Sequence, residues 1–227
     1  MKKSFIYASL VLAMAITLFT ACGSDGDGDD KGSGTKDARI SQVIPAKYRT
    51  LLEKYIPIYD GVNPPNVEGI YLKSPNILVF DSENDYEAGR KFVDMYYQLS
   101  GQNMTNNTIN DKEVAADGNT DASGSGAFIS GSDNNFTIFF NQVGTSQGVY
   151  TKKALIISGT KTSTGIKNFH TAWVMIEKGD DPDDKIVSAG AYRVFKDGDG
   201  EASKVNSLPS SAPTRSQSID ELSEVAQ

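Results

Sequence analysis

The fold depends on residues 63–71, Asn-Pro-Pro-Asn-Val-Glu-Gly-Ile-Tyr, where a helical pattern ends and patterns typical of strands begin. The two consecutive prolines cannot continue a helix, because proline has no backbone N–H to donate. Gly69 and Tyr71 then open the first of many short runs that are rich in β-branched and aromatic residues. The stretch therefore predicts a junction between an N-terminal helix and a mainly β domain.

A short amphipathic helix is expected before this junction. Proline suits the first position of a helix, where its missing N–H has no intrahelical partner to lose, and Pro45 stands at that place. Apolar residues then recur with the i, i+3, i+4, i+7 spacing of one helix face: Tyr48, Leu51, Leu52 and Tyr55. We expect the helix to end before Pro57 and to pack this stripe against a sheet or over one end of a barrel.

Nine strand-like runs follow the junction: 67–74, 76–81, 90–100, 108–115, 126–131, 135–143, 149–160, 167–178 and 185–196. In the third run, apolar residues occupy every second position from Val93 to Leu99, which is the period of a half-buried strand. The joins are short and rich in Gly, Asn, Asp and Ser, which favours antiparallel neighbours. We predict an antiparallel up-and-down β-barrel of eight to nine strands, with a β-sandwich as the alternative.

The start of the chain has the layout of a secretory signal peptide over residues 1–21. Lys2 and Lys3 precede an apolar run over 5–19, which is too short to span a membrane comfortably. Residues 18–22, Leu-Phe-Thr-Ala-Cys, resemble a bacterial lipobox, in which the cysteine is acylated and becomes the first mature residue. We therefore expect lipid attachment at Cys22. An ordinary signal peptide followed by a chance cysteine is the alternative.

The chain divides into further segments by composition. Residues 22–38 form an acidic, Gly-rich tether without apolar periodicity, residues 39–205 form one domain with the helix and the barrel, and residues 206–227 read as a disordered tail. Acidic residues directly after the cysteine resemble the surface-export signal of Bacteroidota lipoproteins. We expect an outer-membrane lipoprotein displayed at the cell surface, with retention facing the periplasm as the alternative.

Composition narrows the chemistry. The formal net charge is −7, and an acidic surface repels phosphate backbones, which argues against nucleic-acid binding. Cys22 is the only cysteine and His170 the only histidine, so a thiol nucleophile, a disulfide or a multi-histidine metal site is not expected in the mature domain. We predict a protein that is not an enzyme and has no cofactor. A hydrolase with two carboxylates stays open, because such a pair needs no local motif.

Two acidic stretches are the only candidates for a metal. Asp197, Asp199 and Glu201 look like the start of a calcium loop, but the positions that should hold glycine and glutamate are Ala202 and Leu208. An acidic turn that ends a strand is the favoured interpretation. Residues 180–184, Asp-Asp-Pro-Asp-Asp, are interpreted in the same way.

The aromatic content suggests a binding role for the barrel. The chain has 10 Tyr, 10 Phe and one Trp, and most of those on predicted strands should fill the core. A minority could line a cavity, for which the candidates are Tyr97, Phe128, Phe139, Trp173 and Met175. We predict a binding module for a small apolar or glycan-derived ligand. The alternative is a structural component of a cell-surface complex that binds an envelope protein and no small ligand.

Gly69, Tyr71 and Arg193 carry a resemblance to lipocalins and related calycins. In that family a Gly-x-Trp opens the first strand after a helix, and an arginine of the last strand packs on the aromatic ring at the closed end of the barrel. Here Tyr71 replaces the tryptophan and Arg193 lies in the last predicted strand. The resemblance implies a lipocalin-like barrel in which Tyr71 and Arg193 meet. The lipobox and acidic tether also resemble those of β-rich lipoproteins of gut Bacteroidota.

Overall fold

The computed structural model describes residues 40, 43–118, 121–146 and 149–209. The predicted signal peptide, Cys22, almost all of the tether and almost all of the tail lie outside these residues. The protein is mainly β, with 56% of its residues in strands and 6% in helices. This confirms the predicted fold class.

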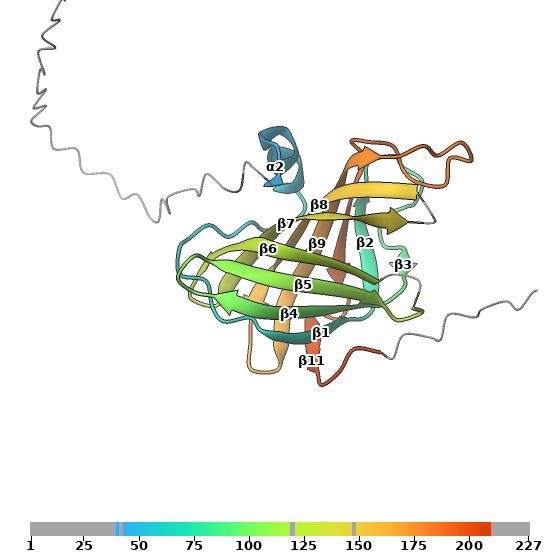
Figure 1. Cartoon of the computed structure of the whole chain (residues 1–227). Helices are drawn as coiled ribbons and strands as arrows, with labels where there is room; N and C mark the ends of the chain where they lie inside the picture. Colours follow the sequence, from blue (N-terminus) through green and yellow to red (C-terminus); the bar gives the residue numbers. More distant parts are fainter. Residues whose placement is uncertain (1–39, 41–42, 119–120, 147–148, 210–227) are drawn as a thin grey trace, which may run out of the picture. The chain divides into compact units, whose positions relative to one another are not determined.

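The elements of the described residues, most of them labelled in Figure 1, follow in chain order: α2 (Ala46–Leu52), β1 (Gly69–Lys73), β2 (Asn76–Asp81), β3 (Lys91–Phe92), β4 (Met95–Asn103), β5 (Thr108–Ala115), β6 (Asp121–Ser132), β7 (Asn135–Ser146), β8 (Val149–Lys161), β9 (Gly165–Lys178), β10 (Tyr192–Asp197) and β11 (Glu201–Val205).

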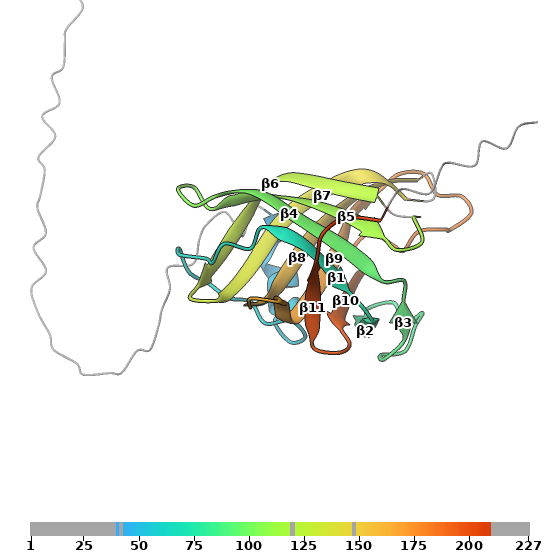
Figure 2. The same cartoon turned by 90° about the horizontal axis from the view of Figure 1, so that it is seen from below.

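Eight of these strands close an antiparallel barrel. The order around the ring is β1-β4-β5-β6-β7-β8-β9-β11, and every pairing is antiparallel. Strand β11 completes the ring because it pairs with β1 along one edge and with β9 along the other (Figure 2). A sandwich would leave the two sheets unjoined at this point, so the alternative fold is excluded.

A three-stranded flap extends the wall of the barrel. The upper part of β9 pairs with β10, then β10 pairs with β2 and β2 with β3. The chain passes from ring to flap at the cis Ser74–Pro75 bond, between β1 and β2. Two carboxylates brace this kink. Asp197 accepts a hydrogen bond from the Ser74 backbone N–H at 3.0 Å, and Asp94 accepts one from the Ser74 hydroxyl at 2.7 Å.

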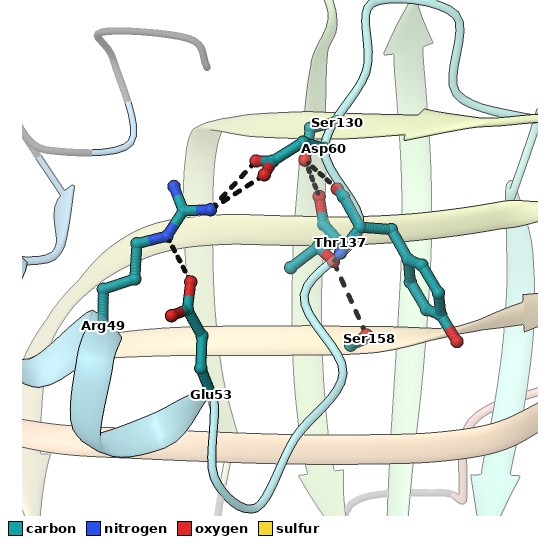
Figure 3. Close-up of polar contacts among 7 residues, drawn as sticks. Arg49, Glu53, Asp60, Ser130, Thr137 and Ser158 are labelled. Carbon is teal, nitrogen blue, oxygen red and sulfur yellow. Dashed lines mark hydrogen bonds and ion pairs between the residues drawn. The ribbon is translucent and has the colours of Figure 1, made fainter. Parts of the chain in front are cut away.

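Helix α2 packs on the outside of the barrel rather than over an end. Leu52 is fully buried against outward-facing residues of β6 to β10, among them Phe128, Phe139 and Val194, and Tyr48 and Tyr55 pack against the same cluster. Arg49 of helix α2 connects the helix to the segment that follows it (Figure 3). Its guanidinium pairs with Glu53 at 2.7 Å and with Asp60 at 3.0 Å.

Outward-facing hydroxyls hold the segment after the helix against the barrel (Figure 3). The Tyr59 N–H donates to the Thr137 hydroxyl at 2.8 Å, and the Ser130 hydroxyl donates to the Tyr59 carbonyl at 2.7 Å. The Ser158 hydroxyl donates to the Pro57 carbonyl. These bonds give partners to backbone groups that have no sheet neighbour, where an unsatisfied buried group would cost about 1–3 kcal/mol.

The end of the chain differs from the sequence expectation. The run 185–196 is predicted as the last strand, but β10 begins only at Tyr192, and the strand that closes the barrel is the unpredicted β11. Strand β11 consists mainly of polar and small residues. Its Ala202 points into the core, whereas its Ser203 and Lys204 are exposed. A five-residue strand with one inward apolar residue leaves almost no periodic signal.

Gly165 offers a test of the closure. A Cβ at this position would lie 2.2 Å from the carbonyl oxygen of Ala202, because the β9 backbone approaches β11 closely there. Gly165→Ala should force these strands apart and lower the free energy of unfolding by more than about 2 kcal/mol. Urea unfolding followed by circular dichroism measures the effect.

Gly144→Ala is the matched control. Gly144 also lies on a barrel strand, but a Cβ there meets no atom within 4 Å. Its free energy of unfolding should stay within about 0.5 kcal/mol of the wild type or rise slightly. Equal losses in the two variants would contradict the proposed role of the β9–β11 contact.

Candidate functional site

The inside of the barrel has two halves of different chemistry. One half, which contains Val67 and Tyr71, is filled by apolar side chains. They form one cluster: Val67, Tyr71, Leu99, Ile109, Ala127, Ile129, Phe136, Ile138, Phe140, Ile157, Ile166, Phe169 and Ala202. We call it the closed half, because this cluster packs it solid.

The other half, here called the open half, contains a cavity of about 390 Å³. Its size lies within the range of small-molecule pockets, which is about 300–1,000 Å³. The wall comes from the barrel and from the flap: Lys73, Asn76, Phe92, Val93, Met95, Tyr97, Glu113, Ala115, Asp117, Gln142, Ser146, Lys153, Leu155, Thr171, Trp173, Arg193 and Phe195. Unlike the closed half, this wall mixes polar and charged side chains with apolar ones.

Lys73 is fully buried at this wall. The next inward residue along β1 after Tyr71 is this lysine, and its Nζ donates to the Thr171 hydroxyl at 2.6 Å. Nζ also lies 5.1 Å from the ring centroid of Tyr97 and 5.4 Å from that of Phe195. Burial lowers the pKa of Lys73 to about 7, although Glu113 and Asp197 attract its charge. The ammonium is therefore poorly compensated by the protein.

Glu113 on β5, Gln142 on β7 and Lys153 on β8 form a polar group of the wall. Glu113 is 8% exposed and Gln142 is 7% exposed. Among the described residues, Glu113 Oε1 and Gln142 Nε2 have no hydrogen-bond partner. Burial raises the pKa of Glu113 against the attraction of Lys73 and Lys153, and burial lowers the pKa of Lys153. A bound molecule could supply the partners that these groups lack.

Asp111 lies one inward position before Glu113 on β5, toward the closed half. It is 3% exposed, and neither of its carboxyl oxygens has a hydrogen-bond partner among the described residues. Burial, reinforced by the charge of Glu113, raises the pKa of Asp111 well above its usual range. Asp111 does not line the cavity, so the two carboxyl groups do not face each other across it.

Trp173 and Arg193 face each other on paired strands and form one side of the cavity. The guanidinium of Arg193 lies 5.7 Å from the Trp173 ring. Two carboxylates neutralise this guanidinium, Asp81 at 3.0 Å and Asp85 at 2.8 Å. The arginine therefore holds the indole in place rather than presenting a free charge.

The five predicted pocket residues are only partly brought together. Tyr97 and Trp173 line the cavity. Phe128 and Phe139 do not, because they point outward and pack beneath helix α2. Met175 packs in a small separate cluster with Val149 and Ile186. The alternation on β9 is as expected, with Phe169, Thr171 and Trp173 inward and Ala172 and Val174 outward.

Tyr71 and Arg193 do not meet. Tyr71 pairs across the ring with Lys204 of β11, whereas Arg193 pairs with residues of β9 and β2 in the flap. The Tyr71 hydroxyl donates to the Val67 carbonyl at 2.9 Å, and the cation near its ring is Lys161 at 5.8 Å. Gly69 leaves room for that hydroxyl, since a Cβ there would lie 3.0 Å from it.

The acidic candidates for a metal act as turn residues. Asp197 accepts backbone hydrogen bonds from Ser74, Asp199 and Gly200, and Glu201 accepts from the hydroxyls of Thr162 and Thr164. Within the described ranges, no three His, Cys, Asp or Glu side chains gather as metal ligands. His170 Nδ1 contacts the Asn168 carbonyl at 2.7 Å and lies outside the cavity.

The sequence interpretation missed the polar groups of the wall. Each of the five occupies the inward phase of a strand that also has inward apolar residues: Lys73, Glu113, Gln142, Lys153 and Thr171. On β5 the inward series is Ile109, Asp111, Glu113, Ala115. Charged residues at inward strand positions were the signal in the sequence that could have indicated this polar group, because a buried charge needs a partner.

The comparisons with protein-family models, curated proteins and solved structures found no match to the chain. In the part of the chain that the structure describes, no helix has the length and apolar character needed to cross a membrane.

The buried Lys73 should leave a signature in the pH dependence of stability. In the unfolded chain this lysine keeps its proton up to its ordinary pKa of 10.5, but in the folded chain it loses the proton above about pH 7. Between these values the unfolded state binds more protons, so the free energy of unfolding rises with pH. This single group contributes at most about 1.4 kcal/mol per pH unit.

Lys73→Met removes that contribution. The free energy of unfolding of the wild type, measured by urea titration, should increase relative to the variant between about pH 7 and pH 9. A difference between the two proteins that stays constant across this window would show that Lys73 keeps its ordinary pKa.

Proposed function

We propose that this protein is a non-enzymatic binding module, which holds a small polar ligand in the open half of its barrel while a lipid on Cys22 anchors it to the cell envelope. The observation that carries the proposal is the 390 Å³ cavity with buried polar groups in its wall. A barrel filled from end to end would not support it. The contrast with the apolar closed half favours the open half as the place of binding.

The polar groups of the wall favour a glycan-derived ligand over an apolar one, the two ligand types that the aromatic content suggested. An apolar ligand would leave Glu113 Oε1 and Gln142 Nε2 without hydrogen bonds, and each unsatisfied buried group costs about 1–3 kcal/mol. A glycan-derived ligand can satisfy such groups, because a hydroxyl both donates and accepts. Trp173 and Tyr97 add aromatic surface against which the less polar face of a sugar ring can pack.

The anchoring part of the proposal rests on the sequence. Residues 18–22 resemble a lipobox, and the acidic residues that follow favour display at the outer surface of the outer membrane. Two or more acyl chains are expected, because a single chain binds a membrane only marginally. A tethered binding module at this place would meet molecules that arrive from outside the cell.

Trp173 makes ligand binding measurable, because it is the only tryptophan of the chain and lies in the cavity wall. The full chain purified from its host should carry a small-molecule adduct in native mass spectrometry. Adding back the released molecule to emptied protein should shift the Trp173 emission. Ala115→Phe places a ring in the cavity and should abolish both signals; Ser146→Phe, at a less buried wall position, is a second blocking variant.

Val143→Phe is the control for added aromatic volume. Val143 is 57% exposed and does not line the cavity, so this variant should keep the adduct. A protein that is empty when purified and shows copurification of a single envelope protein instead would favour the structural alternative.

The anchor has its own test. Cys22→Ser removes the acyl acceptor, so the variant should move from the detergent phase to the aqueous phase in a partition assay of host cells. Mass spectrometry of the wild type should find two or three acyl chains on the N-terminal peptide. An unchanged membrane fraction in the variant would contradict lipid attachment at Cys22.

A further inference from the structure

We propose that the ligand class is a small hydroxylated carboxylate of the acidic-sugar type, whose carboxylate binds between Gln142 and Lys153 and whose ring packs on Trp173. This inference rests on the proposed binding function and specifies the chemistry of the same cavity. It is carried by the register of β7 and β8, by the unmet hydrogen-bonding groups of the wall and by the distribution of charge around them.

The register places two hydrogen-bond donors side by side. Gln142 and Lys153 are directly opposite each other on the antiparallel strands β7 and β8, and both line the cavity. Directly opposite residues have Cβ atoms about 4.5–5.5 Å apart, so their side chains can reach one group together. The amide of Gln142 and the ammonium of Lys153 both donate, and a carboxylate has two oxygens that accept.

The amide needs such an acceptor. Gln142 is 7% exposed, and although its side chain interacts with Glu113 and lowers the pKa of that carboxyl group, its Nε2 makes no hydrogen bond of normal geometry among the described residues. The ammonium of Lys153 lies 5.8 Å from the ring centroid of Trp173 and is attracted by Glu113. A carboxylate between these donors would satisfy the amide and compensate the half-buried lysine at the same time.

The remaining charges of the wall leave this position for an anion. Arg193 is already neutralised by Asp81 and Asp85. Two lysines, Lys73 and Lys153, then face one deep carboxyl group, Glu113. Asp197 accepts three backbone N–H bonds at the kink, and Asp117 is exposed at the mouth. Glu113 is therefore shared between two lysines, although Asp197 also attracts Lys73, and a further carboxylate beside Lys153 would be favoured.

Glu113 and Asn76 explain why the anion should carry hydroxyl groups. Glu113 Oε1 and Asn76 Oδ1 are buried acceptors without a partner among the described residues. A plain carboxylate offers them no donor, whereas hydroxyls on the same molecule do. Trp173 supplies a flat apolar surface beside Lys153, which suits the C–H face of a sugar ring. A carboxylate, hydroxyls and a ring face together describe an acidic sugar.

Three probes separate these features in the full chain freed of bound molecules. Glucuronate has the carboxylate, the hydroxyls and the ring; gluconate lacks the ring; glucose lacks the carboxylate. Binding is measured by Trp173 fluorescence and by calorimetry. Glucuronate should bind most tightly, and glucose should bind about tenfold more weakly or worse, because it loses a hydrogen-bonded charge contact. Gluconate should bind with a smaller change in Trp173 emission.

Lys153→Met tests the residue directly. It should weaken glucuronate binding by about tenfold or more and leave glucose binding unchanged. Lys152→Met is the matched control, since Lys152 is the preceding lysine on β8 and does not line the cavity. Gln142→Leu is a second variant that removes the other donor, in case Lys153→Met does not fold.

The outcomes separate this inference from the proposed function. Equal affinity for glucose and glucuronate, or binding of a neutral or apolar molecule alone, overturns the acidic-sugar assignment while the cavity remains a binding site. Absence of glucuronate binding at millimolar concentration overturns it as well. A protein that shows neither a native adduct nor binding of any probe removes both proposals together.

Discussion

The contact on which the structure depends is the double pairing of β11. Five residues join β1, the first strand of the ring, to β9, the seventh, and so turn a long meander into a closed barrel. Closure gives every ring strand two neighbours, which removes the free edges that an open sheet would expose. It also encloses an interior with two ends, and the chain fills these differently. The packed half supplies the hydrophobic stabilisation, and this leaves the other half free to hold polar groups that an unclosed sheet would expose to water.

The flap adds a second part to the wall of the open half. The chain leaves the ring between β1 and β2 and returns to it between β10 and β11. The pair β1–β11 therefore helps to close the ring, and the pair β2–β10 builds the separate wall of the flap. Asp94 and Asp197 hold the kink through hydrogen bonds to Ser74 and its neighbours. Wall residues such as Phe92, Arg193 and Phe195 come from the flap, whereas Glu113, Gln142 and Lys153 come from the ring. The candidate site thus lies where two differently supported parts of one sheet meet.

Much of the fold was accessible from the sequence, and the reasons for the misses are physical. The helix stripe of Tyr48, Leu52 and Tyr55, the strand alternation and the Gly/Asn/Asp turns all reflect local periodicity, and each predicted its element. Strand β11 was missed because a short strand with one inward apolar residue has no measurable period. Of the five expected pocket residues, only Tyr97 and Trp173 line the cavity, because hydrophobicity alone does not say which face of a strand is inside. Phe128 and Phe139 are apolar because a helix covers them from outside. The predicted contact between Tyr71 and Arg193 is wrong, because Tyr71 lies in the ring and Arg193 in the flap. No local sequence pattern reveals the kink that separates their strands.

The shortness of β3 has a consequence for crowded surroundings. It is the last strand in the order of the flap, and it offers only Lys91 and Phe92 as a template. A longer exposed edge would invite strand addition from an identical molecule nearby, the first step of cross-β aggregation. A chain concentrated on a membrane surface would encounter its copies far more often than one free in solution. The two-residue border therefore offers an identical molecule little backbone with which to pair.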